Sequence, residues 1–539
     1  MSERKPGVKF DRAAVDAIFE SVDQCHLPGA AVGVALGGRP IYRRGFGLAN
    51  IELPIVLTPA TRMRIYSATK QFACLAFMLL CEDGKADIDA PIGRYFPDFH
   101  PTWKRVTARQ LMGHNSGLRD ILELRWIFSG ASRNVSIDEM MSFCHDIDDA
   151  NCSPRTTWCY NNGAYQILSA AIQRISDESL EDILKKRIFD PIGMNDTLLR
   201  QVDSDFVPNS ASMHVKGASG QYERNYTPGP AAGNGGIVST VDDMLRWMAH
   251  MDMPHVGSTE TWSLMKTPQI LLNGVSTGYG LGLIKSRYRG IETLSHSGGG
   301  QGANCLMMKV PSAGLDVIVI VNRSDVMSVD LVNGILDSYI PDLVEVKEPV
   351  NEIKANGVFL SESGGKVIQL TTAPPNHRRI KEGRAIVSLN GFDIPVRLDD
   401  RGVLRPIGSL DSLKLEFELQ GDVAQPTAIR LSDFGNLTEL VRMPPSGRES
   451  DDGEIVGRYR SDATDSEVDI FGDKGGMEFN STGRFGTSRF KLERLNRGVY
   501  RCRSSEGYPW GGVLLFEQYG KGFRFSSLQN WALPFRRLA

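Results

Sequence analysis

A serine and a lysine stand three residues apart just before an apolar helix, and this stretch constrains the fold more than any other. Ser67 and Lys70 lead into residues 71–80, which are mostly apolar and predict about three buried helical turns. Positions i and i+3 of a helix share a face, so the Lys70 amine can reach the Ser67 hydroxyl. The sequence therefore predicts a core built around a helix with a polar pair at its mouth.

The pair suggests a nucleophile with its base. A serine hydroxyl is a weak nucleophile, and burial favours the neutral form of a lysine that could activate it. Backbone N–H groups at the helix start could face the oxyanion that forms when Ser67 attacks a carbonyl. Ser-x-x-Lys occurs five times, at Ser2, Ser67, Ser263, Ser363 and Ser488, so at least four copies are chance. Only the Ser67 copy precedes an apolar helix, and the rest of the chain must decide between catalysis and coincidence.

Composition and charge exclude several classes of partner. A chain of 539 residues predicts two to four domains, and a net charge of -3 favours neither nucleic acid nor an acidic membrane. Residues 1–10 lack the apolar segment of a signal peptide, and no apolar run is long enough for a membrane span, so we expect a soluble cytoplasmic protein. The eight cysteines lack Cys-x-x-Cys spacing, which argues against a zinc site and a disulfide scaffold. We expect no metal and no cofactor.

The first part of the chain reads as an α/β domain. Helices are predicted at residues 11–24 and 164–175, and strands at 29–36, 40–47, 279–283, 293–295, 304–310 and 315–321. These elements predict an antiparallel sheet flanked by helices. Residues 233–236 are glycine-rich, but no P-loop lysine follows them, so nucleotide binding is rejected.

Tyr160 and Asn162 stand at the entrance of the second helix and form the only Tyr-x-Asn in the chain. A tyrosine beside a lysine can relay a proton, because a neighbouring cation favours the phenolate. Asn162 could hold both Lys70 and a substrate amide through its oxygen and its NH2 group. The alternative is that Asn162 only caps the helix.

His296 directly follows the predicted strand at residues 293–295. Gly298 and Gly299 come next and would let a ligand approach the backbone closely. His114 lies between a helix end and an Asn-Ser-Gly turn. It could act as a base, but we interpret it as a residue that holds the backbone.

From residue 341 the sequence changes character. Residues 341–352 and 444–453 read as linkers, and strands of alternating polarity such as residues 413–419 fill the rest. Residues 357–362 and 457–462 share the pattern Gly-x-aromatic-x-Ser-acid. We infer duplicated all-β modules, each a closed barrel, because closure removes exposed edges. The predicted domains are residues 1–340, 352–443 and 453–539.

The three motifs at Ser67, Tyr160 and His296 occur in an order that resembles the serine β-lactamase and penicillin-recognising superfamily. Residues 111–118, 235–242 and 279–283 resemble the segments that accompany those motifs, so the resemblance covers residues 10–340. Histidine in place of the usual lysine of Lys-Thr-Gly, with two β-domains after the catalytic one, is similar to the D-stereospecific aminopeptidases. Residues 187–194 and 457–462 extend that similarity to almost the whole chain.

The resemblance implies a serine β-lactamase-like fold and an acyl-enzyme mechanism. It implies that Ser67 attacks while Lys70 and Tyr160 move protons. The N–H groups of Ser67 and Gly299 would form the oxyanion hole, and the substrate-binding residues would be Asn162, His296, Gly298 and Gly299. A largely neutral imidazole at His296 holds a substrate carboxylate less strongly than a lysine, which disfavours carboxypeptidase and β-lactamase activity.

In aminopeptidases of this kind a loop of the last domain enters the active site. The matching place is residues 503–511, a shorter loop, whose only acidic residue is Glu506. Glu506 is the candidate partner of a substrate ammonium, with a solvated loop charge as the alternative.

Three functions are in view. They are an aminopeptidase or amidase that releases an N-terminal D-residue from a small peptide or aminoacyl amide, a broad esterase using the same serine, and a penicillin-binding-like sensor without turnover. The sequence leaves the oligomeric state open, with a homodimer as one option.

Overall fold

The computed structural model describes residues 10–130, 135–217, 219–226, 229–345, 355–363, 365–374, 380, 382–399, 401–407, 414–445, 452–473, 476–505, 510–517 and 520–538. They form two compact units. The first unit holds the described residues within 1–88, 168–269 and 278–347, and the second holds those within 89–167, 270–277 and 348–539. Helix α7 (Asn162–Ser176) has residues in both.

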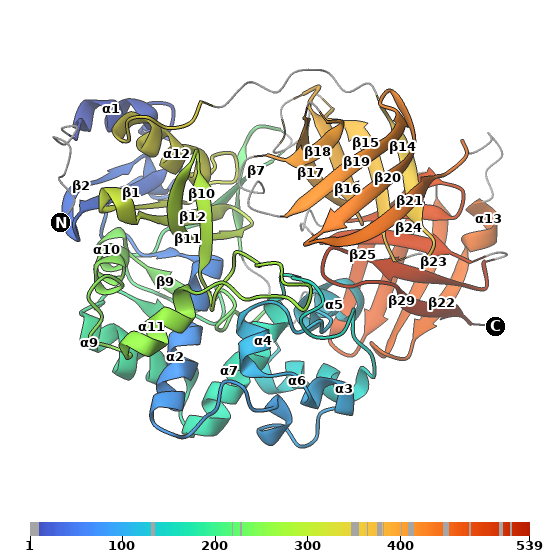
Figure 1. The fold of residues 1–539 in the computed structure, drawn as a ribbon, viewed down its shortest axis with the longest axis horizontal. Coiled ribbons are helices and arrows are strands. Elements are labelled where there is room, and N and C mark those ends of the chain that lie inside the picture. Colours follow the sequence, from blue (N-terminus) through green and yellow to red (C-terminus); the bar gives the residue numbers. More distant parts are fainter. Residues whose placement is uncertain are drawn as a thin grey trace. The chain divides into compact units, whose positions relative to one another are not determined.

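Six strands of the first unit form an antiparallel sheet (Figure 1). In sheet order they are β10 (Ile284–Tyr288), β11 (Ile291–Gly300), β12 (Ala303–Val310), β13 (Leu315–Val321), β1 (Ala30–Leu36) and β2 (Arg39–Phe46). The N-terminal hairpin joins the later strands because β1 pairs with β13, from Ala30 opposite Val321 to Leu36 opposite Leu315. The predicted antiparallel sheet is confirmed.

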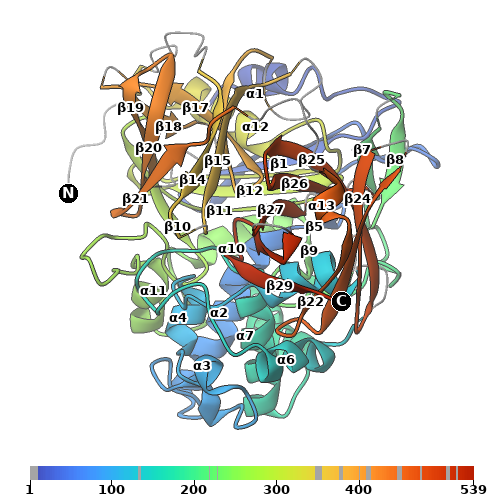
Figure 2. The same cartoon turned by 90° about the vertical axis from the view of Figure 1, so that its right-hand side faces the viewer.

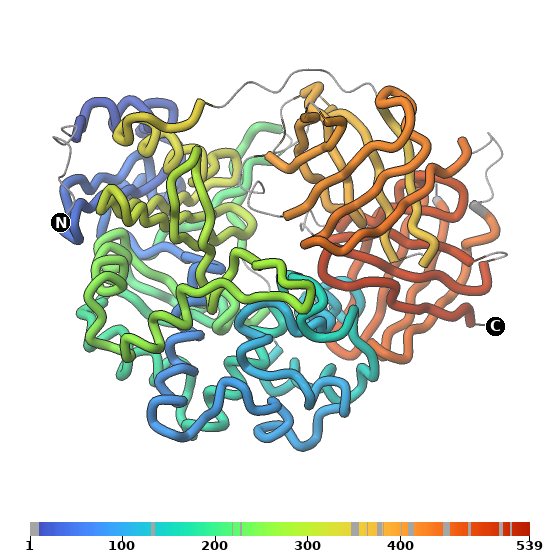
Figure 3. Tube along the Cα trace, in the orientation of Figure 1, coloured from blue at the N-terminus to red at the C-terminus, as the bar shows by residue number. Residues whose placement is uncertain are grey.

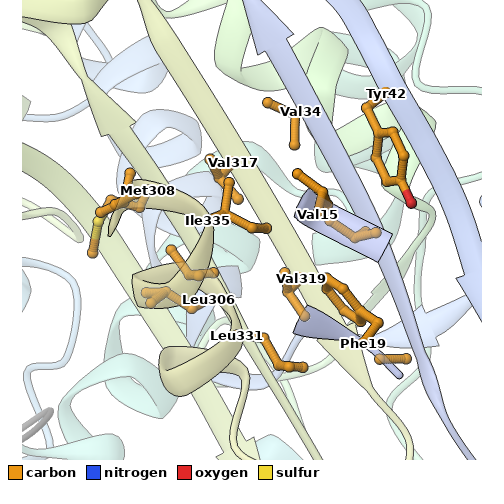
Figure 4. Close-up of a cluster of buried hydrophobic side chains, with 14 of the residues drawn as sticks. Val15, Phe19, Val34, Tyr42, Leu306, Met308, Val317, Val319, Leu331 and Ile335 are labelled. Carbon is orange, nitrogen blue, oxygen red and sulfur yellow. The ribbon is translucent and has the colours of Figure 1, made fainter. Parts of the chain in front are cut away.

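Helices cover both faces of this sheet. On one face, Val15 and Phe19 of the α1 (Arg12–Ile18) region and Leu331 and Ile335 of α12 (Ser328–Tyr339) pack on strand valines such as Val319 (Figure 4). On the other face lies α10 (Val241–His250). A Cβ on Gly33 of β1 would lie 2.5 Å from the Val241 side chain, so the glycine permits this close packing.

The helix that follows Ser67 is buried as the sequence predicts. It is α2 (Lys70–Glu82), with every residue from Lys70 to Leu80 buried. Phe72 packs against Trp247 with ring centroids 4.0 Å apart. The structure differs from the prediction at the helix start, because Ser67 lies in a preceding 3-10 turn, η1 (Tyr66–Thr69), and not in α2 itself.

Shorter elements complete the first unit. They are β3 (Leu48–Asn50), β4 (Ile55–Val56), β5 (Met63–Arg64), β6 (Leu198–Leu199), β7 (Met213–Lys216), β8 (Tyr222–Asn225), β9 (Ile237–Ser239), α8 (Leu180–Leu184), η4 (Lys185–Phe189), α9 (Asp190–Ile192), α11 (Thr259–Lys266) and η5 (Pro311–Ala313). The second unit begins with η2 (Ile92–Arg94), α3 (Pro101–Lys104), α4 (Ala108–Met112), α5 (Ile121–Leu124), η3 (Arg125–Ser129) and α6 (Ile137–Asp146). Among the residues described, no helix has both the length and the apolar character to cross a membrane.

The rest of the second unit contains two closed antiparallel barrels, drawn in yellow-orange to red (Figures 2 and 3). The first consists of β14 (Gly357–Ser361), β15 (Val367–Thr372), β16 (Ala385–Leu389), β17 (Phe392–Leu398), β18 (Val403–Pro406), β19 (Leu415–Asp422), β20 (Gln425–Asp433) and β21 (Asn436–Arg442). The second follows α13 (Asp452–Ile455) and consists of β22 (Gly457–Ser461), β23 (Ser466–Asp473), β24 (Gly476–Gly483), β25 (Gly486–Asn496), β26 (Val499–Ser504), β27 (Gly511–Phe516), β28 (Gly522–Ser526) and β29 (Leu533–Arg537). The repeated Gly-x-aromatic-x-Ser pattern is the first strand of each barrel, so the predicted pair of barrels is confirmed.

Two predicted elements are wrong in extent or type. Residues 279–283 are not a strand, because the chain turns there. Gly282 has φ +72°, and a Cβ on it would lie 2.7 Å from the backbone of Gln71 in α2. The predicted helix at residues 11–24 ends at Ile18. Turns such as the Val22 N–H bond to Phe19 O follow it and keep both side chains buried.

Candidate active site

Ser67 and Lys70 meet where η1 runs into α2. Lys70 Nζ lies 3.1 Å from Ser67 Oγ and donates a hydrogen bond to the Asn234 backbone oxygen at 2.8 Å. Lys70 is fully buried and Ser67 is half-buried. An amine at this distance can take the hydroxyl proton, so the pair has the geometry of a nucleophile with its base.

The backbone immediately before Ser67 is strained. Tyr66 has φ +48°, a left-handed conformation that costs a non-glycine residue about 1 to 3 kcal/mol. The Tyr66 hydroxyl donates to Met213 Sδ at 2.7 Å. Its ring packs so closely on β11 that a Cβ on Gly300 would lie 2.2 Å from it. These contacts hold the turn that presents Ser67.

The glycine run of β11 passes directly beside this turn. A Cβ on Gly298 would lie 2.0 Å from the backbone oxygen of Ile65, so only glycine fits there. Gly299 faces the other way, is exposed, and would place a Cβ no closer than 4.0 Å to any atom outside its chain neighbours. β10 pairs with β11 only as far as Ser295, so in the described sheet residues 296–300 have β12 as their one strand partner. This leaves backbone near Ser67 that a substrate could approach.

His296 is buried, and both of its ring nitrogens have partners. Its Nδ1 lies 2.6 Å from the Ser297 backbone oxygen, and because a carbonyl only accepts, Nδ1 carries the proton. Nε2 therefore accepts from the Tyr279 hydroxyl at 2.9 Å. Burial first, and then the charge of Lys70, lower the pKa of His296 to about 3. His296 is thus neutral at ordinary pH, and its nitrogens are committed to the protein.

Sequence reasoning missed Tyr279 as an individual side chain, although it contacts the candidate residue His296. We expect Tyr279→Phe to lower the free energy of unfolding by about 1 to 3 kcal/mol, because the buried Nε2 loses this donor. Hydrolytic kcat/KM should fall about tenfold as the His296 ring loses its fixed orientation. Thermal unfolding and initial rates measure the two effects, and an unchanged melting temperature would show that the bond between Tyr279 and His296 does not stabilise the fold.

In the second unit, His114 holds the segment that contains Tyr160. His114 Nδ1 accepts a hydrogen bond from the Asn161 N–H at 3.0 Å, and its ring lies against the Tyr160 ring with centroids 4.3 Å apart. His114 is buried and has φ +57°. These contacts agree with its interpretation as a residue that fixes the backbone.

The start of α7 is capped by Asn161 and by Asp120. Asn161 Oδ1 accepts from the Ala164 N–H at 2.7 Å, which is the N-cap bond, so the helix does not need Asn162 for that role. Asp120 Oδ2 accepts from the Asn162 N–H at 2.6 Å and Oδ1 accepts from the Gly163 N–H at 3.0 Å. Sequence reasoning missed Asp120, because an acidic residue before a short helix has many other uses.

Comparison with known proteins assigns the family. A sequence profile described as Beta-lactamase matches residues 14–336, which is more than half of the chain. The chain belongs to the beta-lactamase family. The matched range contains Ser67, Lys70, Tyr160, Asn162 and His296.

Curated relatives of this beta-lactamase family member extend beyond the matched range. A D-aminopeptidase of Brucella melitensis biotype 2 (strain ATCC 23457) is 25% identical over 478 residues, covering 87% of this chain and 86% of the relative. A D-aminopeptidase of Brucella anthropi is 26% identical over 485 residues, covering 88% and 86%.

Solved structures share the fold. An octameric penicillin-binding protein homologue from Pyrococcus abyssi has a TM-score of 0.56 at 21% identity and covers 79% of this chain and 99% of its own. D-amino acid amidase from Ochrobactrum anthropi SV3, complexed with D-phenylalanine, has a TM-score of 0.52 at 24% identity, with coverages of 60% and 98%.

Within this beta-lactamase family member the candidate residues fall in both units. The first unit brings together Ser67, Lys70, His296, Gly298 and Gly299, whereas Tyr160 and Asn162 belong to the second. A shared role of Lys70 and Tyr160 therefore stays a prediction. Glu506 lies outside the described residues. In the remainder of its loop, the Trp510 ring stacks on Trp126 with centroids 3.8 Å apart.

Proposed function

We propose that the protein is a serine hydrolase that releases an N-terminal D-amino acid from small peptides or aminoacyl amides through an acyl-enzyme. The observation that carries the proposal is the 3.1 Å approach of Lys70 Nζ to Ser67 Oγ at the start of a buried helix. The similarity of nearly the whole chain to proteins called D-aminopeptidase supports the substrate class.

In the proposed mechanism, Ser67 Oγ forms a bond to the substrate carbonyl carbon while Lys70 and Tyr160 accept and pass on its proton. The N–H groups of Ser67 and Gly299 would stabilise the oxyanion. The C–N bond then breaks, and the amine leaves with a proton returned by the same two side chains. Water attacks the ester by the reverse route and releases the free D-amino acid, so atoms and protons balance over the cycle.

The neutral state of His296 favours an aminopeptidase over a carboxypeptidase. A carboxypeptidase needs a cation for the substrate carboxylate, and a buried imidazole with a pKa of about 3 carries no charge at neutral pH. We propose that His296 acts on substrate position indirectly, by shaping β11 beside Gly298 and Gly299. Asn162 is proposed to bind the substrate amide, and Glu506 the substrate ammonium by a charge-assisted hydrogen bond.

A panel of four chromogenic substrates tests the proposal. These are D-alanine p-nitroanilide, its L-enantiomer, N-acetyl-D-alanine p-nitroanilide and p-nitrophenyl acetate. We expect kcat/KM for the D-anilide to exceed that for each of the other two anilides about a hundredfold, which corresponds to about 2.7 kcal/mol of transition-state binding. Equal rates on the two enantiomers, with rapid acetate hydrolysis, would instead identify a broad esterase. Acylation of Ser67 without turnover of any substrate would identify a ligand sensor.

A further inference from the structure

The connection between the last two strands of the second barrel is bound to the helical part of its own unit. This connection, residues 527–532, joins β28 to β29. Asn151 Nδ2 donates to Gln529 O at 2.7 Å, and Asn151 Oδ1 accepts from the Trp531 N–H at 2.9 Å. Arg119 Nη1 donates to Trp531 O at 2.8 Å. The connection is therefore held on either side of its central residue, Asn530.

Asn530 is fully buried and binds the backbone of Asp120 twice. Its Oδ1 accepts from the Asp120 N–H at 3.1 Å, and its Nδ2 donates to the Asp120 backbone oxygen at 3.3 Å. Nδ2 also donates to Glu123 Oε2 at 2.6 Å, and the Ser527 hydroxyl donates to the same oxygen. An amide fixed on both its donor and its acceptor side allows one placement of Asp120.

Asp120 passes this placement on to the start of α7. Its side chain is fully buried, and its Oδ1 accepts from the Leu122 N–H at 2.9 Å as well as from Gly163. Only its Oδ2 reaches the Asn162 N–H, at 2.6 Å. The start of α7 is thus linked to Asn530 through one carboxylate, in addition to the bonds that His114 makes to the same segment.

Two carboxyl groups, those of Asp120 and Glu123, are buried at this contact. Burial raises the pKa of Asp120 above its usual range, and burial followed by the charge of Asp120 raises the pKa of Glu123 to about 8. Below that pH, Glu123 keeps its proton and does not repel Asp120. Cys159 and Cys502 also interact with Glu123, and both are buried thiols whose pKa values burial raises, so they stay neutral.

We propose that Asn530 is a positioning residue for Tyr160 and Asn162. Through it, the second barrel would fix the orientation of the Tyr160 side chain, which precedes α7 by two residues. The inference rests on the proposed role of Tyr160 in proton transfer. Asn530 would touch no substrate atom and would act only through Asp120.

The test combines Asn530→Ala with Tyr160→Phe in a double-mutant cycle. We expect Asn530→Ala to lower kcat about 10- to 100-fold and to raise KM by less than that, at most about tenfold, because it misplaces the tyrosine and shifts Asn162, the proposed contact of the substrate amide. In the Tyr160→Phe background the same change should cost less than about threefold. Asn496→Ala is the matched control. Asn496 is a buried asparagine of the same barrel that donates to Pro444 O at 3.1 Å, and its loss should leave kcat within about twofold.

Asp120→Asn checks the next link and remains informative if Asn530→Ala unfolds. It keeps the oxygen that binds Leu122 and Gly163 but turns an NH2 group toward the Asn162 N–H, so kcat should again fall, with a smaller rise in KM from the displaced Asn162. Two results overturn the inference alone: an equal loss from Asn530→Ala with and without Tyr160→Phe, or full activity of Asn530→Ala beside an inactive Tyr160→Phe. Full activity of Tyr160→Phe overturns the proposed role of Tyr160 together with it.

Discussion

Ser67→Ala is expected to abolish the acyl-enzyme and to lower kcat/KM on a D-aminoacyl anilide on the order of 10^4- to 10^6-fold, the scale seen when a serine hydrolase loses its nucleophile. The alanine has no oxygen to form the ester, while the rest of the site remains. Ser67 is half-buried in a one-turn helix, and without its oxygen Lys70 Nζ keeps the bond to the Asn234 backbone oxygen, so thermal stability should change little.

The measurement is the intact mass of the protein after mixing with a D-aminoacyl p-nitrophenyl ester. The native chain should gain one acyl group and the variant none. Ser263→Ala is the control, because Ser263 opens another Ser-x-x-Lys copy and is exposed on α11. An adduct that persists in Ser67→Ala would mean that the nucleophile is a different residue.

Removing Lys70 and Tyr160 is expected to give the second-largest loss. Lys70→Ala and Tyr160→Phe should each lower kcat about 10^2- to 10^4-fold, the usual range for general acid–base groups. If the two side chains form one proton-transfer unit, the double variant should be little worse than the poorer single variant, because the second change removes a path already broken.

The cycle is read from single-turnover rates with the D-anilide, alongside melting temperatures for each variant. Lys266→Ala provides the control for deleting a shielded lysine. Lys266 is the lysine of the Ser-x-x-Lys copy that begins at Ser263, and it donates to Met251 O at 2.6 Å. Its loss should leave the rate unchanged. Fully additive losses for Lys70 and Tyr160 would show that they act in separate steps.

The fold was predictable where a local repeat carried the information. The apolar residues 71–80 predict a buried helix, which the structure contains as α2. The predicted strand at residues 315–321 is β13. The same signal misled at residues 279–283. There Tyr-Gly-Leu-Gly-Leu alternates in size with period two, but Gly282 serves a turn against α2 and Gly280 packs against the backbone at the end of α11.

Contacts between distant residues were not predictable from one sequence. Tyr279 lies 17 residues from His296, and Asn530 lies 410 residues from Asp120. Tyr279 and Asn530 both lie in irregular segments, where no hydrophobic periodicity predicts which distant residue a side chain will contact. Ser67, Lys70 and Tyr160 could be predicted as candidates only because each belongs to a short motif with fixed spacing along the chain. Such a motif does not identify the buried residues that hold it in place.

The two barrels look like copies of one module, and they meet the Tyr160 segment through the same part of that module. In the first barrel the link between its seventh and eighth strands, β20 and β21, contacts this segment. The Phe434 ring lies 5.5 Å from the Trp158 ring, and Asn436 Nδ2 donates to Thr156 O at 2.9 Å. In the second barrel the link between β28 and β29, again the seventh and eighth strands, holds Asp120, and its Leu528 O accepts from the Cys159 thiol of the Tyr160 segment at 3.7 Å. Duplication of a module ordinarily leaves one copy spare and free to drift. Here both copies have a structural role, because each contributes the corresponding link to the support of the Tyr160 segment, so a substitution in either link is expected to disturb that segment.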